Sequence, residues 1–257
     1  MNLRRALDGL VRMAQDARPQ YRADGLAVTR RNLGFLRDPR FDEAWRKAAA
    51  GAAAAFPNGD VPDVRWRAHV ACWAAQHAMR HDGDFVECGV FVGLLSLTVC
   101  HFLDFAKLDR SFFLFDTFAG IPDRGLSEAE RRSAAWLNRE LYFDCYDVTK
   151  RNFAPFPNAH LVKGILPESL GEVAPRMPRI AYLSMDLNAT KAEHDVIVAL
   201  WDRLVPGAVV LIDDYGFAGH DSQQAMWNAF ASDRLLAIAT LPTGQGLLIK
   251  PAGPGPS

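Results

Sequence analysis

Residues 179–214 read RIAYLSMDLNATKAEHDVIVALWDRLVPGAVVLIDD, and this stretch decides the fold class. Two short apolar runs, 179–186 and 207–214, each end in aspartate, and a helical pattern covers residues 190–204 between them. Two continuous apolar strands separated by a helix are typical of a parallel sheet that is covered on both faces. The stretch therefore predicts an α/β fold whose aspartate-bearing strand ends lie at one edge of the sheet.

The same alternation of strands and helices extends over most of the chain. The apolar runs DFVECGV, SFFLFD and AHLVKG begin at residues 84, 111 and 159, and a helical pattern covers residues 94–106. Near the C-terminus, residues 235–241 and 246–250 are strand-like and are joined by PTGQ, a tight connection that favours a hairpin. We therefore expect a mainly parallel sheet with one antiparallel strand at its edge.

Residues 1–82 differ in their pattern of apolar residues from the sheet domain, residues 83–250, and are predicted to be helical. The positions that carry this prediction are Leu3, Leu7, Leu10 and Val11, then the run AAAGAAAA within residues 41–56, then Trp66, Val70, Trp73 and His77 within residues 63–81. We expect the alanine run to pack closely against a neighbouring element. The aromatic stripe of the third helix is expected to face the core.

Residues 118–152 form a long, polar and aromatic-rich insertion in which no strand is predicted. Such an insertion in a compact α/β domain is usually a lid or a substrate loop. Residues that could close over a ligand are Trp136, Tyr142, Phe143 and Tyr146. Residues 251–257 are expected to be a flexible tail.

Composition excludes several classes of protein. The 257 residues include 29 Lys or Arg and 30 Asp or Glu, so the formal net charge is -1, and 49% are hydrophobic. These values exclude a disordered chain and a nucleic-acid binder that works by bulk positive charge. No secretory signal is found in the first twenty residues, and no uncharged stretch is long enough to span a membrane. The four cysteines are scattered and suggest neither a zinc site nor disulfides. Together these observations lead us to expect a cytoplasmic protein that binds neither nucleic acid nor membranes.

Acidic residues and glycines end the predicted strands, where open parallel sheets bind their ligands. The first strand ends in Glu87 and Gly89, and the turn Gly89-x-x-x-Gly93 lacks the GxGxxG pattern of dinucleotide-binding proteins. A carboxylate there would repel a pyrophosphate and suits a positively charged cofactor such as S-adenosylmethionine. Asp116 ends the second strand, where a carboxylate can accept both hydroxyls of a ribose. Alternatively, Asp116 caps a helix that begins near Thr117.

Three further aspartates end two consecutive strands. Asp186 follows one strand, and Asp213 and Asp214 follow the next, so the three carboxylates could share one site. Oxygen ligands of this kind suit a hard divalent cation such as Mg²⁺. Alternatively, Asp213 is a helix N-cap and Asp214 is exposed to solvent.

Several blocks together resemble the macrocin-type sugar O-methyltransferases, which are class I enzymes that use S-adenosylmethionine and Mg²⁺. The blocks are GDFVECGVFVG, LFDTFAGIP, residues 182–216 and LPTGQGLLIKP, and the resemblance covers roughly residues 64–250. It implies a Rossmann-like sheet of about seven strands with the last strand reversed. It further implies cofactor contacts from Glu87, Gly89, Gly93, Ser96, Asp116 and Gly164, and Mg²⁺ ligands from Asp186, Asp213 and Asp214.

One departure from this family concerns the general base. Members often carry two acidic residues, two positions apart, where this chain has Ser184 and Asp186. A serine hydroxyl is a poor proton acceptor at neutral pH, so either the base or a metal ligand is missing from its usual place. Two replacements are open: Asp186 or water acting on a metal-bound hydroxyl, and His220 or Asp221 beyond the metal strand.

The function expected from the sequence is Mg²⁺-dependent methylation of a sugar hydroxyl or of a similar polar metabolite. Two alternatives are a catalytically inactive relative that binds the cofactor without turnover, which Ser184 would explain, and an NAD-linked oxidoreductase. The acceptor cannot be read from the sequence. We also expect a homo-oligomer, because the helical N-terminus is apolar and rich in alanine.

Overall fold

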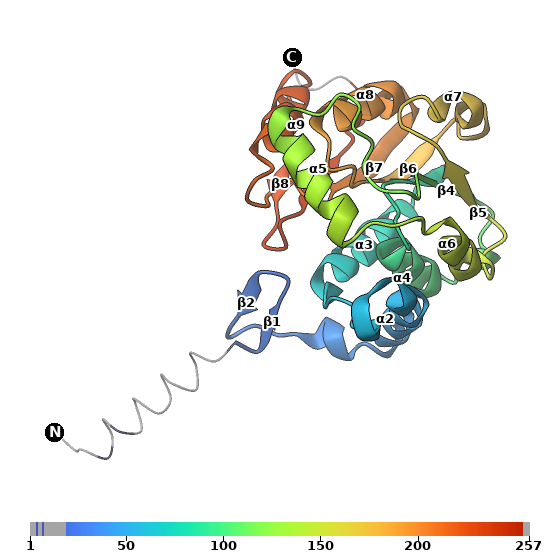
Figure 1. Cartoon of the computed structure of the whole chain (residues 1–257). Coiled ribbons are helices and arrows are strands. Elements are labelled where there is room, and N and C mark those ends of the chain that lie inside the picture. Colours follow the sequence, from blue (N-terminus) through green and yellow to red (C-terminus); the bar gives the residue numbers. More distant parts are fainter. Residues whose placement is uncertain (1–3, 5–6, 8–18, 254–257) are drawn as a thin grey trace.

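The computed structural model describes residues 4, 7 and 19–253, and its centre is a seven-stranded sheet (Figure 1). The strand order is β5-β4-β3-β6-β7-β9-β8. The strands are β3 (Asp84–Cys88), β4 (Phe112–Asp116), β5 (Ala159–Lys163), β6 (Ile180–Met185), β7 (Leu204–Ile212), β8 (Ala239–Thr240) and β9 (Gly246–Ile249). Strands β3 to β7 pair in parallel, and β9 runs antiparallel to both β7 and β8. The predicted α/β class, the five parallel strands and the C-terminal hairpin are confirmed, but the reversed strand lies one position inside the edge.

Helices cover the sheet on both faces. They are α2 (Pro39–Ala52), α3 (Arg65–Ala78), α4 (Leu94–Leu103), α5 (Glu128–Glu140), α6 (Tyr146–Phe153), α7 (Leu170–Val173), α8 (Thr190–Leu200) and α9 (Asp221–Ser232). Helices α2, α3 and α4 pack on one another on one side of the sheet, and α8 and α9 pack together on the other (Figure 1). Because both faces are covered, strands such as β6 are buried over their whole length, which explains their continuous apolar sequence. None of the described helices is long and apolar enough to cross a membrane.

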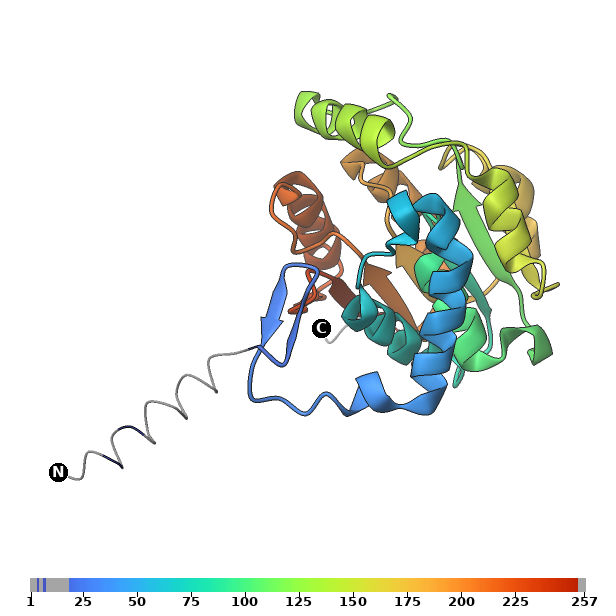
Figure 2. The ribbon, with the colours of Figure 1, turned by 60° about the horizontal axis from the view of Figure 1, so that its bottom comes forward.

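The N-terminal region contains a β-hairpin that the helical prediction missed (Figure 2). Strands β1 (Tyr21–Ala23) and β2 (Leu26–Val28) pair antiparallel around Asp24 and Gly25. Both turn residues have positive φ, 53° and 71°, which is the conformation that Asp-Gly favours in a two-residue hairpin loop. The Asp24-Gly25 pair could therefore have predicted this hairpin from the sequence. Of the predicted helix over residues 3–11, the structure describes only Arg4 and Leu7; both are helical, and Leu7 is 53% exposed.

Helices α2 and α3 bury their small residues. Ala48 and Ala52 of α2 are fully buried, as expected for the alanine run. In α3, however, the buried face consists of alanines and Cys72, whereas Trp73 of the predicted core stripe is 47% exposed. The prediction for this stripe was wrong, because small side chains let α3 lie close to α4 and to the sheet. The aromatic side chains are left at the rim and the surface.

The insertion of residues 118–152 contains helix α5 and the start of α6. A capping box starts α5: the Ser127 hydroxyl accepts from the Glu130 amide, and the Glu130 carboxylate accepts from the Ser127 amide. The other Glu130 oxygen accepts the Thr190 amide at 2.7 Å. The capping residue thus also fastens the insertion to the first turn of α8.

Candidate active site

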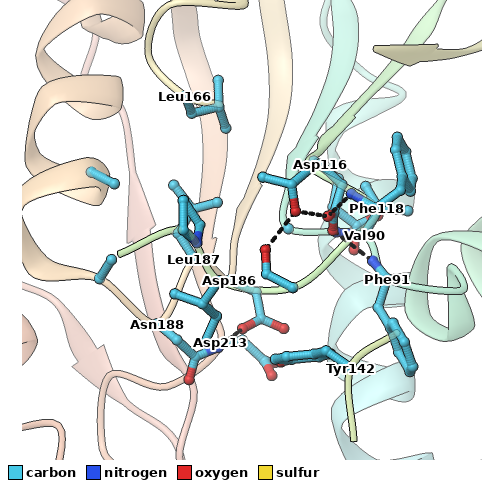
Figure 3. Close-up of a pocket in the computed structure, with 18 of the residues that line it drawn as sticks. Val90, Phe91, Asp116, Phe118, Tyr142, Leu166, Asp186, Leu187, Asn188 and Asp213 are labelled. Carbon is cyan, nitrogen blue, oxygen red and sulfur yellow. Dashed lines mark hydrogen bonds between the residues drawn. The ribbon is translucent and has the colours of Figure 1, made fainter. Parts of the chain in front are cut away.

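A cavity of about 330 Å³ opens at the carboxyl ends of the parallel strands (Figure 3). Its size lies in the range that small-molecule ligands occupy. Residues from all parts of the chain line it, including Glu87, Gly89, Asp116, Gly164, Asp186 and Asp213 from the strand ends, Phe56 and Arg67 from the N-terminal region, and Tyr142 from the insertion. The predicted location of the ligand site at this edge therefore coincides with the cavity. Gly93, Ser96, Asp214 and His220 do not belong to its lining among the described residues.

Glu87 places a carboxylate in the wall of the cavity with one oxygen unsatisfied. The residue is 4% exposed, and its Oε2 atom has no hydrogen-bond partner among the described residues. Loss of water around the carboxylate raises the pKa of Glu87 to about 8, while a hydrogen bond with Ser96 acts in the opposite direction. A buried acceptor of this kind fits a cationic ligand group, so the residues present fit the cofactor expected from the sequence.

Gly89 is required by the approach of two strand ends. Its φ is 90°, and a Cβ atom at this position would lie 1.8 Å from the carbonyl oxygen of Asp186. The turn after β3 can therefore lie directly against the end of β6 only because residue 89 has no side chain. Gly93 has a different role: it precedes α4 with a φ of 84°, and a Cβ there would collide with the ring of Phe153.

Asp116 braces the loop that follows β3. Its Oδ2 atom accepts the amides of Val90 and Phe91 at 2.6 and 2.8 Å, and its Oδ1 atom accepts the Phe118 amide at 2.6 Å. The Thr117 hydroxyl adds a longer contact at 3.4 Å. Four donors match the hydrogen-bonding capacity of a carboxylate, so a ribose hydroxyl would have to share or displace one of them. No described helix begins near Thr117, so the alternative of a helix cap does not apply.

Asp186, Asp213 and Asp214 come together as predicted. One carboxylate oxygen from each lies within 4.8 Å of the others, and we call this group the acidic cluster. Burial, together with the charges of Asp214 and Asp213, raises the pKa of Asp186 well above its usual value. Burial and the charge of Asp213 likewise raise the pKa of Asp214 to about 6. Three carboxylates at this distance favour binding of a proton or a cation.

The structure adds three partners of the acidic cluster that sequence reasoning missed. The Arg67 guanidinium donates to Asp213 Oδ2 at 2.5 Å, and the Gln245 amide donates to Asp213 Oδ1 at 2.9 Å. The Asn188 amide donates to Asp186 Oδ1 at 3.1 Å. One positive charge faces three carboxylates, so the cluster retains oxygen ligands and negative charge that fit a hard divalent cation. The alternative, with Asp213 as an N-cap and Asp214 fully exposed, does not hold, because α9 begins at Asp221 and Asp213 is 2% exposed.

Tyr142 was predicted to belong to a lid, and the structure brings it to the acidic cluster. The side chain points toward Asp186 and Asp213 (Figure 3), and its ring packs edge-on against Phe91 at 5.2 Å. Burial and the charges of the surrounding aspartates raise its pKa, so the phenol stays protonated and can donate a hydrogen bond. The insertion thus supplies a neutral donor to a site of negative charge.

The two replacements for the general base occupy different places. Asp186 lines the cavity, whereas His220 precedes α9 and its Nδ1 atom hydrogen-bonds to the side-chain oxygen of Gln223. The charge of His220 lowers the pKa of Asp214, so the histidine influences the cluster from its far side. Asp221 is exposed at the first position of α9. Ser184 is 3% exposed within β6, with its Cα opposite Glu87 on β3.

The fold is similar to that of solved O-methyltransferases. The O-methyltransferase NovP aligns with a TM-score of 0.66 at 19% identity, over 82% of this chain and 98% of that chain. The calicheamicin methyltransferase CalS11 aligns with a TM-score of 0.58 at 17% identity, over 82% of this chain and 93% of that chain. These likenesses show that the chain shares the fold of these two solved proteins.

Comparisons of the sequence identify the family to which the chain belongs. Mycinamicin III 3''-O-methyltransferase of Micromonospora griseorubida is 28% identical over 142 residues, which are 52% of this chain and 55% of that protein. Demethyldecarbamoylnovobiocin O-methyltransferase of Streptomyces niveus is 27% identical over 138 residues, 52% of this chain and 53% of that protein. These matches span about half the length of either relative. The macrocin-O-methyltransferase (TylF) family model matches residues 31–238, so the chain belongs to this family.

Proposed function

We propose that this protein transfers a methyl group from S-adenosylmethionine to a hydroxyl of a sugar or of a related polar metabolite, with Mg²⁺ bound at the acidic cluster. The observation that carries the proposal is one cavity lined both by the unsatisfied Glu87 carboxylate and by Asp186 and Asp213 of the acidic cluster. Such a cavity offers a place for a cationic donor beside a place for a metal-bound acceptor. Family membership supports this reading and disfavours the NAD-linked alternative.

The β3 half of the cavity would hold the cofactor. When bound, S-adenosylmethionine supplies an electrophilic methyl group on a positively charged sulfur. Glu87 offers its unsatisfied oxygen to the cationic part of the ligand, and Gly89 and Gly164 form part of the wall beside it. Gly93 and Ser96 act from behind the wall: Gly93 shapes the start of α4, and Ser96 lowers the pKa of Glu87. Asp116 keeps the intervening loop in shape.

The β6 and β7 half would hold the metal and the acceptor. If bound there, Mg²⁺ would supply Lewis acidity that makes a hydroxyl of the acceptor more acidic. Asp186, Asp213 and Asp214 would provide the oxygen ligands, and the protonated phenol of Tyr142 could donate a hydrogen bond to an acceptor there. The rings of Phe56 and Phe91 contribute apolar wall to the cavity, which suits the flat apolar face of a sugar ring.

Asp186 is the better placed of the two candidate bases. It lines the cavity, where an acceptor hydroxyl could reach it, whereas His220 lies outside the lining. An Asp186 oxygen would accept the proton of the acceptor hydroxyl as the carbon–oxygen bond forms and the methyl carbon–sulfur bond of the donor breaks, which leaves S-adenosylhomocysteine as the neutral product. His220 would then tune the charge of Asp214 rather than touch the acceptor.

A turnover assay tests the proposal. The protein is incubated with S-adenosylmethionine, Mg²⁺ and a panel of nucleotide-linked sugars and glycosylated macrolides, and release of S-adenosylhomocysteine is measured. We expect turnover with at least one acceptor and its loss on addition of EDTA. In parallel, calorimetry compares binding of S-adenosylhomocysteine with binding of NAD. Binding of NAD alone would overturn the proposed cofactor, and turnover that survives EDTA would overturn the metal.

A further inference from the structure

Arg67 connects the acidic cluster to the N-terminal hairpin. On one side its guanidinium donates to Asp213; on the other it donates twice to Asp24, at 2.7 Å from Nε and 2.9 Å from Nη2. Two parallel hydrogen bonds fix the plane of a guanidinium, which a single contact does not. Asp24 therefore determines where the third contact of Arg67 points, although it lies in the turn between β1 and β2, far from the sheet in sequence.

The bridge from Asp24 through Arg67 to Asp213 is sheltered from water. The side chains are 16%, 19% and 3% exposed, respectively. The ring of Phe217 lies 5.4 Å from the guanidinium carbon and covers it further. Electrostatic interactions in such surroundings are screened far less than those at the surface, so each charge of the bridge influences the cluster.

The hairpin is held in place by contacts other than this bridge. Tyr21 of β1 packs edge-on against Trp66 with ring centres 5.6 Å apart, and its hydroxyl lies 3.3 Å from the Asp63 carboxylate. Trp66 precedes Arg67 in α3, so the hairpin and the arginine are anchored on the same turn of one helix. Removing the Asp24 carboxylate alone therefore leaves the hairpin a packing site.

We propose that the charge of Arg67 lowers the affinity of the acidic cluster for a divalent cation, and that Asp24 in the N-terminal hairpin controls this effect through its ion pair with Arg67. This inference rests on the proposed cation site and assigns the N-terminal region a role in it. Arg67 fixes one oxygen of Asp213 and lowers the negative charge available to the cation. Asp24 in turn offsets part of the Arg67 charge.

The sign of each effect follows from these charges. Arg67→Gln removes a positive charge beside the site while Gln245 still holds the other Asp213 oxygen, so the cation binds more tightly, by about tenfold. Asp24→Asn leaves the Arg67 charge uncompensated, so the cation binds about threefold more weakly. The double variant Asp24→Asn/Arg67→Gln behaves like Arg67→Gln, because Asp24 acts through the arginine.

The test uses the full chain, stripped with EDTA and titrated with Mn²⁺ alone, which prefers the same oxygen ligands as Mg²⁺. Loss of the free Mn²⁺ signal in electron paramagnetic resonance gives the dissociation constant of each variant. Arg65→Gln is the matched control, because Arg65 lies two residues away on α3 and pairs with Asp63 instead of the cluster. It should bind Mn²⁺ like the wild type. Tighter binding by Arg67→Gln cannot result from misfolding.

Each outcome has a definite meaning. Tighter binding by Arg67→Gln, weaker binding by Asp24→Asn and no further effect of Asp24→Asn in the Arg67→Gln background support the inference. Mn²⁺ binding that Arg67→Gln leaves unchanged or weakens overturns the inference and leaves the proposed cation site standing. If neither the wild type nor Arg67→Gln binds Mn²⁺, the metal half of the proposed function falls as well. Binding of S-adenosylhomocysteine, measured separately, reports on the cofactor half.

Discussion

The two halves of the carboxyl edge satisfy their acidic residues in opposite ways. On the β4 side, Asp116 accepts three short hydrogen bonds from backbone amides. These bonds satisfy its carboxylate and stabilise the neighbouring loops. On the β6 and β7 side, three carboxylates face one guanidinium and two side-chain amides. A carboxylate whose oxygens all accept hydrogen bonds from the protein stabilises the fold. A group of carboxylates with too few donors and too little positive charge around it binds protons or cations instead. The comparison separates residues that shape the site from residues that act in it.

The largest expected effect comes from removing a cluster carboxylate that lines the cavity. Asp186→Asn should lower methyl transfer by about a thousandfold or more, because it removes a proposed metal ligand and the proposed base together. Thermal stability should change little, since the substitution relieves repulsion in the cluster. Turnover assays and thermal unfolding check this. Asp42→Asn, which affects an exposed pair with Arg46 outside the cavity, serves as control, and a fully active Asp186→Asn enzyme would contradict the assignment.

The pH dependence of stability tests Glu87. Its folded pKa is raised from 4.5 to about 8, so the folded state holds a proton that the unfolded state releases between these values. The contribution of Glu87 to the free energy of unfolding of the cofactor-free protein should therefore be most favourable below pH 4.5. It should fall by roughly 3–5 kcal/mol as the pH rises to 8. Urea unfolding at pH 5 and pH 8 measures the fall. Glu87→Gln should lack this component, and equal slopes in both proteins would refute the prediction.

Asp116→Ala should destabilise the fold rather than alter the chemistry. The substitution leaves three backbone amides without their acceptor, which costs about 2–4 kcal/mol. Chemical unfolding gives this value, and affinity for S-adenosylhomocysteine should fall because the loop after β3 loses its brace. Asp123→Ala, at an exposed ion pair with Arg131, is the control and should cost less than about 0.5 kcal/mol. A stable Asp116→Ala variant would mean that the loop does not need this carboxylate.

The smallest effect concerns the hairpin turn. Gly25→Ala should cost about 1 kcal/mol, because residue 25 has a φ of 71° and nothing within 4 Å of an added Cβ. Hydrogen exchange should show the loss confined to residues 21–28. By comparison, Gly171→Ala introduces a Cβ into equally open space without a positive φ and should not destabilise the protein. Equal stability of both variants would argue against strain at the Asp-Gly turn.

Sequence reasoning was most accurate where each element carries its own signal. The continuous apolar runs that end in Asp116, Asp186 and Asp213 predicted the strands, because a strand buried on both faces must be apolar throughout. It failed for the Trp73 stripe, because periodicity does not say which face of a helix the neighbouring elements leave open. It also missed the hairpin around Asp24, whose two strands have only three residues each. The proposed homo-oligomer and the cytoplasmic location stay predictions.

The sequence by itself determined the order of strands and helices and the placement of acidic residues at the strand ends, because local patterns record burial and chain reversal. Only the tertiary structure decided which of these carboxylates remain available to bind a proton or a cation. Arg67, Gln245 and Tyr142 lie on three elements far apart in the chain, and no local pattern links them to Asp186 or Asp213. Their contacts depend on how helix, hairpin and insertion pack around the sheet, and this packing sets the charge balance of the site.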